Sequence, residues 1–166
     1  MKNLIVAFAF LILSACTGGY SFTGGDTGAA KTVSVDFFPN NSNLVQPELS
    51  QKFTEALKDI FVRQTSLELK SRNGDMQFEG AITDYNVQPI NAQASDLGAV
   101  AQNRLTVRVN VIFTNTTDPK KDFEKSFSRF ADFDSSENLS DVESDLIDQI
   151  TAELAENILN AAIGDW

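Results

Sequence analysis

Hydrophobic and polar residues alternate most regularly between Asn103 and Thr114. Apolar residues occupy the odd positions from Leu105 to Phe113, and polar or charged residues occupy most of the even positions. This period of two predicts a strand with one buried face. The segment from Asp122 to Phe133 is predicted as its antiparallel partner. Near the end of that segment the phenylalanine spacing changes from alternation to three residues, which predicts a break in register there.

Three further segments have the composition and alternation of strands. The segment Thr32–Phe38 places Val33, Val35 and Phe37 on one side, where burial is expected. The segments Leu67–Lys70 and Met76–Val87 are separated by a turn over residues 72–75. Apolar residues change parity near Asp84, which predicts a β-bulge. Residues 89–102 are small and polar and are predicted as a long connecting loop.

Two segments have the spacing of amphipathic helices. The first runs from Pro47 to Thr65 and the second from about Asp141 to Ile163, each with apolar residues three and four positions apart. Pro47 suits the first helical position. Ser140 and Glu143 have the spacing of a capping box at the start of the second helix.

These elements follow one another in the order β-α-β-β-β-β-α. Two amphipathic helices are sufficient to cover one face of a sheet, so the sequence predicts an α+β fold with both helices on one face of a four- to five-stranded mixed sheet. Residues 31–166 are expected to form this single domain.

The N-terminal residues resemble a bacterial lipoprotein signal. Lys2 precedes an apolar run of ten residues from Leu4 to Leu13, too short to span a membrane, and residues 1–15 are predicted as the signal peptide. The residues Leu13-Ser14-Ala15-Cys16 have the pattern of a lipobox, in which Cys16 receives a diacylglycerol and an acyl chain. An ordinary signal peptide with a nearby cysteine is the alternative. Glycine-rich residues 16–30 are predicted as a flexible tether.

Sorting and chemistry are both constrained by what the sequence lacks. No aspartate follows Cys16, which favours the periplasmic face of the outer membrane. The chain has no histidine, one cysteine and a net charge of −10, which argues against a histidine-based catalytic triad, a metal site and a nucleic-acid partner. We expect no catalytic residues. An enzyme using carboxylates near the strands (Asp36, Asp84, Asp132 and Asp134) is the weaker alternative.

One segment of this acidic chain is basic. Residues 104–129 contain six basic residues against three acidic ones, and no basic residue follows. The segment is a candidate site for lipopolysaccharide or another anionic ligand. It has an equally simple structural interpretation, which is neutralisation of the acidic C-terminal helix. The six candidates are Arg104, Arg108, Lys120, Lys121, Lys125 and Arg129.

Several stretches resemble one known family. The lipobox is followed by the residues YSFTG (20–24), and later by KTVSVDFFPN (31–40), GDMQFEGAITDY (74–85) and DPKKDFEKSFSRF (118–130). These are similar to the lipopolysaccharide-assembly lipoprotein family LptE in its Bacteroidota form. The resemblance implies a non-enzymatic outer-membrane lipoprotein that plugs a β-barrel of the LptD type, assists its assembly and passes lipopolysaccharide to the outer leaflet. A periplasm-facing scaffold lipoprotein of another envelope complex is the alternative.

Overall fold

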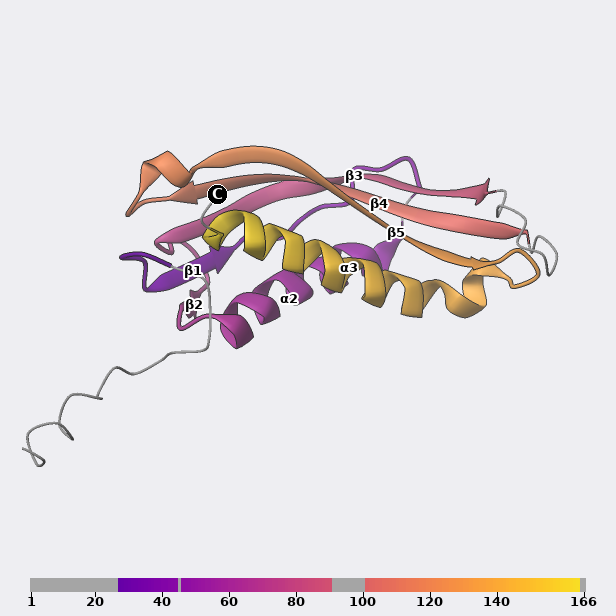
Figure 1. Ribbon diagram of the computed structural model, residues 1–166, viewed down its shortest axis with the longest axis horizontal. Helices are drawn as coiled ribbons and strands as arrows, with labels where there is room; N and C mark the ends of the chain where they lie inside the picture. Colours follow the sequence, from indigo (N-terminus) through magenta and orange to yellow (C-terminus); the bar gives the residue numbers. More distant parts are fainter. Residues whose placement is uncertain (1–26, 45, 91–100, 165–166) are drawn as a thin grey trace, which may run out of the picture.

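The computed structural model describes residues 27–44, 46–90 and 101–164. The predicted signal peptide, Cys16 and most of the predicted tether lie outside the described residues, as does most of the predicted loop after Pro89. The remaining residues form one sheet and two long helices, drawn in Figure 1.

The sheet has five strands in the order β2-β1-β3-β4-β5. Strand β1 (Thr32–Val35) pairs in parallel with both β2 (Glu68–Lys70) and β3 (Met76–Ile90). Strand β3 pairs antiparallel with β4 (Gln102–Asn115), and β4 pairs antiparallel with β5 (Phe123–Asp134). The register between β3 and β4 shifts between Ile82 and Asp84, which confirms the predicted bulge.

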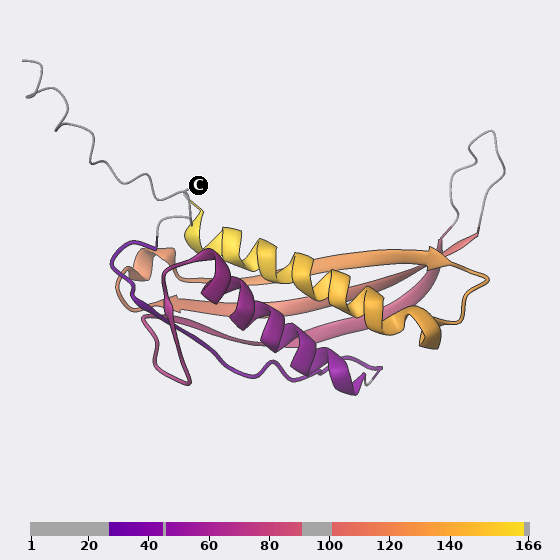
Figure 2. The same ribbon diagram turned by 90° about the horizontal axis from the view of Figure 1, so that it is seen from below.

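Both helices lie on the same face of the sheet, as Figures 1 and 2 show. Helix α2 (Pro47–Gln64) follows β1, and helix α3 (Leu139–Ile163) follows β5. A short 3-10 turn, η1 (Pro119–Lys121), joins β4 to β5. We call the covered side of the sheet the helix face and the opposite side the outer face. The α+β class, the element order and the placement of both helices are therefore confirmed.

The core fills the space between the helices and the helix face. The odd positions of β4 from Leu105 to Phe113 are almost completely buried, as their alternation predicts. Phe61 of α2 packs against Phe78, Phe78 against Phe113, and Phe113 against Phe123, with ring centroids 4.7, 4.7 and 5.1 Å apart. This row of rings ties α2 to three strands of the sheet.

Strand β1 is shorter than predicted. It ends at Val35, and the following residues remain beside β3 through three separate hydrogen bonds, one of which is donated by the amide of Asp36 to the carbonyl of Phe78. Pro39 has no amide hydrogen to continue a regular ladder. The side chain of Phe37 is 63% exposed, whereas Phe38 is buried against Phe53. The expectation that Phe37 is buried is therefore wrong.

Strand β5 keeps its register over its whole length, so the predicted break is wrong. Pairing with β4 is continuous from Phe123 to Asp134. The phenylalanine spacing changes because Phe130 lies on the outer face, where the guanidinium of Arg104 stacks on its ring at 3.6 Å from the centroid. The cation–π contact stabilises this ring at a position where it is not buried.

The predicted capping box at α3 is also wrong. The helix begins earlier, at Leu139, with Asn138 as its N-cap and no side-chain hydrogen bond there. Glu143 accepts a hydrogen bond from the hydroxyl of Tyr85 on β3. Burial of Tyr85, together with the Glu143 carboxylate, raises the pKa of the phenol. Glu143, which the sequence pattern assigned to the helix cap, therefore forms a contact across the core.

Residues 71–75 form a crossover and not a hairpin turn. Strands β2 and β3 lie on opposite sides of β1 and are both parallel to it, so the chain must pass over β1 to connect them. It crosses on the outer face at Gly74. A Cβ atom at Gly74 would lie 2.6 Å from the backbone nitrogen of Ser34 and from the carbonyl carbon of Val33. Glycine is required here because the two backbones touch.

A carboxylate fastens the crossover to the start of β1. One oxygen of Asp75 accepts hydrogen bonds from the amides of Lys31 and Thr32 and from the hydroxyl of Thr32, at 2.9–3.0 Å. The backbone carbonyl of Asp75 accepts another from the amide of Thr116 at 2.8 Å. The bonds from Lys31 and Thr32 lower the pKa of Asp75. Asp75 thus joins β1, β3 and the end of β4.

We predict that Gly74→Ala destabilises the domain by about 1–3 kcal/mol, the usual cost of forcing extra atoms into a packed site. The new methyl group would push the crossover away from β1. Urea unfolding measures the change. Ser71→Ala, at an exposed position before the crossing, serves as the control. Equal stability of the Gly74 and Ser71 variants would contradict the close crossing.

We predict that Asp75→Asn lowers the free energy of unfolding at pH 7, because an amide oxygen without charge binds the three donors more weakly. The pKa of Asp75 is lower when folded, so its contribution is complete above the unfolded value of 3.8. It disappears as the pH falls through the folded pKa. The difference in the free energy of unfolding between variant and parent should therefore become smaller below pH 4. Asp59→Asn, on the exposed side of α2, is the control, and a pH-independent gap would contradict the assignment.

Candidate functional site

A groove runs between the edge strand β5 and the last turns of α3. It consists of two adjacent open hollows of about 510 and 520 Å³, which share Ala161 of α3 as a lining residue. We call the first the lysine pocket and the second the arginine pocket. Their sheet-side walls come from η1 and the first part of β5, and α3 lies closer to β5 than to β4.

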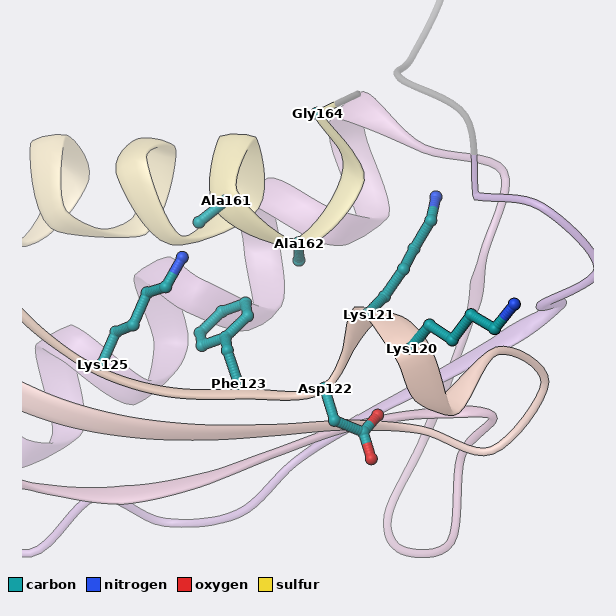
Figure 3. A pocket seen from close by; sticks show the side chains of 8 residues that line it. All are labelled: Lys120, Lys121, Asp122, Phe123, Lys125, Ala161, Ala162 and Gly164. Atoms are coloured by element: carbon teal, nitrogen blue, oxygen red, sulfur yellow. The ribbon is translucent and has the colours of Figure 1, made fainter. Parts of the chain in front are cut away.

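Three lysines surround the lysine pocket, which Figure 3 shows from close by. Lys120 and Lys121 come from η1 and Lys125 from β5. The side chains of Lys121 and Lys125 point toward α3, whereas the carboxylate of Asp122 points away from it. The ammonium of Lys125 lies 5.1 Å from the ring centroid of Phe123.

The connection between β4 and β5 holds these lysines in place. The side-chain oxygen of Asn115 accepts hydrogen bonds from the amides of Thr117 and Asp118 and from the hydroxyl of Thr117, at 2.7–3.0 Å. Asp122 accepts a bond from the amide of Asn115 at 2.7 Å. Because this turn is fixed at both ends, it loses less backbone entropy when its lysines bind a ligand than a loose loop would lose.

The helix end that faces these lysines is negative. The last carbonyls of α3 have no following turn to bond them, and the last turn of the helix contains no basic residue. Ala161, Ala162 and Gly164 are small and leave the pocket open. The lysines therefore lie near the negative end of the helix. The side chains of Lys121 and Lys125 also line a cavity wide enough for a phosphate-sized group, whereas Lys120 extends away from α3.

In the arginine pocket, the basic side chain contacts two polar side chains of α3. Arg129 donates a hydrogen bond to the side-chain oxygen of Asn157 at 2.8 Å and lies 3.7 Å from the carboxylate of Glu153. Both ionic side chains are more than 40% exposed, so the pair is weak. Phe127 forms the apolar part of the wall.

The remaining two candidates lie on the outer face. Arg104 forms a two-pronged ion pair with Asp132, at 2.7 and 2.8 Å, and also stacks on Phe130. This hydrogen bonding lowers the pKa of Asp132. Arg108 is exposed on the same face. The structure thus brings Lys120, Lys121 and Lys125 together, places Arg129 beside them, and separates Arg104 and Arg108 from them by the thickness of the sheet.

Three of the four strand carboxylates considered for catalysis have hydrogen-bond partners in the structure. Asp84 accepts a hydrogen bond from Asn86, and Asp132 is occupied by Arg104. Hydrogen bonds from Ser136 to Asp134 lower the pKa of that carboxyl. Within the described ranges, no three acidic or cysteine side chains are placed to share a metal ion.

Sequence reasoning missed the helix wall of the groove. Asn157, Asn160 and Ala161 belong to it, but on the sequence they read as the polar edge of an amphipathic helix. The only available signal was the pair of small residues Ala161 and Ala162 near the end of the helix. Among the described helices, none is both long and apolar enough to cross a membrane.

Solved structures share this two-layer arrangement. A minor lipoprotein from Acinetobacter baumannii has a TM-score of 0.50 at 13% identity, covering 79% of this chain and 91% of that one. The protein CT253 from Chlamydia trachomatis has a TM-score of 0.52 at 10% identity, covering 82% and 100%. A putative neuraminyllactose-binding hemagglutinin homolog from Helicobacter pylori has a TM-score of 0.53 at 9% identity, covering 83% and 85%. At these identities the likeness concerns the fold.

The fold is therefore that of a small two-layer α+β domain, of a kind also found in the minor lipoprotein from Acinetobacter baumannii. The chain belongs to the LptE family, whose lipopolysaccharide-assembly model matches residues 30–162. This confirms the family resemblance and indicates a role in lipopolysaccharide assembly at the cell envelope. No curated protein sequence gives a significant match.

Proposed function

We propose that this protein is a lipid-anchored outer-membrane partner of an LptD-type β-barrel, acting on the periplasmic side to hold the barrel and to receive lipopolysaccharide during its transfer. Membership of the LptE family supports the role in assembly. The proposed work is binding and positioning, so it requires no catalytic group. Diacylglycerol and an acyl chain on Cys16 would anchor the domain, because several buried acyl chains hold a protein firmly on a membrane.

The observation that carries the lipid part of this proposal is the position of the lysine pocket relative to the anchor. Val33 at the start of β1 pairs with Met76, and Met76 pairs with Asn115, four residues before η1. The tethered end of the domain and the lysines therefore lie at the same end of the sheet. Ala30 lies fourteen positions after Cys16, a span of at most about 50 Å. The lysine pocket is thus held within reach of lipid headgroups.

A phosphorylated glycolipid matches the lysine pocket in chemistry. Lipopolysaccharide presents phosphate groups above acyl chains, and the pocket offers ammonium groups beside Phe123 and the small residues of α3. The chain as a whole is acidic, so binding depends on the local grouping of these lysines. Arg104 is paired with Asp132 on the outer face and does not line this pocket.

We predict that replacing Lys120, Lys121 and Lys125 together by glutamine weakens binding to lipopolysaccharide by at least about tenfold, since each charged hydrogen bond is worth more than a neutral one. The control replaces Arg104 and Arg108 by glutamine and should change the affinity less than about twofold. Surface plasmon resonance on lipopolysaccharide-bearing vesicles measures both. Equal losses in the two variants, or none in the lysine variant, would refute the lysine pocket as the site.

We predict that the tagged full chain, purified from membranes in mild detergent, carries a large outer-membrane β-barrel in near-equal amount, identified by mass. Cys16→Ala should leave the protein without acyl groups and release it from washed membranes. Recovery of a different envelope complex would favour the scaffold alternative, and firm membrane retention of the Cys16 variant would overturn the lipid anchor.

A further inference from the structure

The free edge of β5 is the longest open strand edge in the described part of the molecule. Strand β5 runs for 12 residues and is the last strand of the sheet. No strand among residues 27–44, 46–90 and 101–164 pairs with its outward side. The opposite edge of the sheet is β2, which has only three residues. A long open edge offers a row of backbone donors and acceptors to another strand.

Side chains beside this edge are only partly covered. Phe127 on the helix face is half-buried, and Phe130 on the outer face is 47% exposed although Arg104 stacks on it. Glu124 on the outer face is exposed, and Arg129 on the helix face is 43% exposed. An added strand would cover the two rings and would bring its own side chains opposite the two charges.

A second copy of the chain fits this edge poorly. The backbone groups that point outward from an edge strand belong to every second residue. The two-fold axis that relates two antiparallel copies must therefore pass through a residue and not between two residues. Of these arrangements, those centred on Ser128 and Arg129 have the longest overlap. The first places Glu124 opposite Asp132 of the copy, and the second places Arg129 opposite Arg129 and Glu124 opposite Asp134. Like charges directly opposite each other destabilise a strand pair.

We propose that the free edge of β5 binds an extended strand of a different protein by antiparallel strand addition. The charges and rings of β5 define the sequence of that strand. From its N-terminus, that strand begins with an apolar residue opposite Phe130, followed directly by an acidic residue opposite Arg129. Two positions later it has an apolar residue opposite Phe127. Three positions after that it has a basic residue opposite Glu124. This strand site is separate from the lysine pocket, where the proposed function places lipid phosphate.

Site-specific photocrosslinking in cells tests the strand site with the full lipoprotein. The photoreactive residue p-benzoylphenylalanine replaces Ser126 or Ser128 on β5, and Thr114 on β4 as the control. We expect a protein adduct at both β5 positions and none at Thr114. Mass spectrometry of the crosslinked peptide should show an extended segment with the four-residue pattern described above. An adduct with a second copy, with residues of the same chain or with lipid, or no adduct, would overturn the strand site.

Charge reversal provides a second readout. Arg129→Glu should reduce the β5 adduct at least about tenfold, and reversal of the partner's acidic residue to lysine should restore it. Arg108→Glu, the same charge change on the outer face of β4, should leave the adduct unchanged. Circular dichroism verifies folding, and Arg129→Gln replaces Arg129→Glu if that variant is unfolded. Failure of the partner reversal to restore the adduct would overturn the charge pairing.

The outcomes for the strand site and for the proposed function are distinguishable. A crosslinked strand from a protein other than a β-barrel would support the strand site and contradict the proposed partner. A β-barrel that copurifies but forms adducts only away from β5 would support the proposed partner and overturn the strand site.

Discussion

The whole structure depends on covering one face of a long antiparallel ribbon with only two helices. Strands β3, β4 and β5 have 15, 14 and 12 residues, and their helix-face side chains need a second layer. Helix α2 lies over the parallel strands, and α3 lies against β5 and to a smaller extent against β4. The central strand β4 is therefore fully buried on its helix face, whereas β5 is covered only in part. The groove beside β5 is the consequence of this incomplete cover.

That incomplete cover also explains where the charged residues lie. Arg129 and Lys125 occupy helix-face positions of β5, where a fully covered strand would require apolar residues. They remain there because the edge is open to solvent and because α3 offers Asn157, Glu153 and its negative end. Inward-facing charges on an edge strand also hinder indiscriminate strand pairing. The basic segment thus has a structural role at the edge, and the proposed ligand roles use charges that the fold already tolerates.

Much of the fold was predictable because the strongest signals are periodic. The alternation in β4 and the apolar faces of both helices survive in the structure, and so does the bulge near Asp84. Most of the predictions that failed depend on a partner distant in sequence. Phe130 breaks the alternation because its ring stacks with Arg104 on the outer face. Glu143 does not cap the helix because it accepts a hydrogen bond from Tyr85. The crossover at Gly74 is invisible in the local sequence, since a turn motif does not show which strand it passes over.

The candidate site was predictable in composition but not in space. The presence of six basic residues within one segment was evident from the sequence. Strand parity places two of them on one face of the sheet and two on the other. The direction of the remaining two is set by η1. The acceptors that distinguish them come from other elements. Asp132 occupies Arg104, whereas the end of α3 leaves the lysines beside an open pocket. Because β1 begins at that same end of the sheet, the proposed tether would leave the domain at the end where these lysines lie.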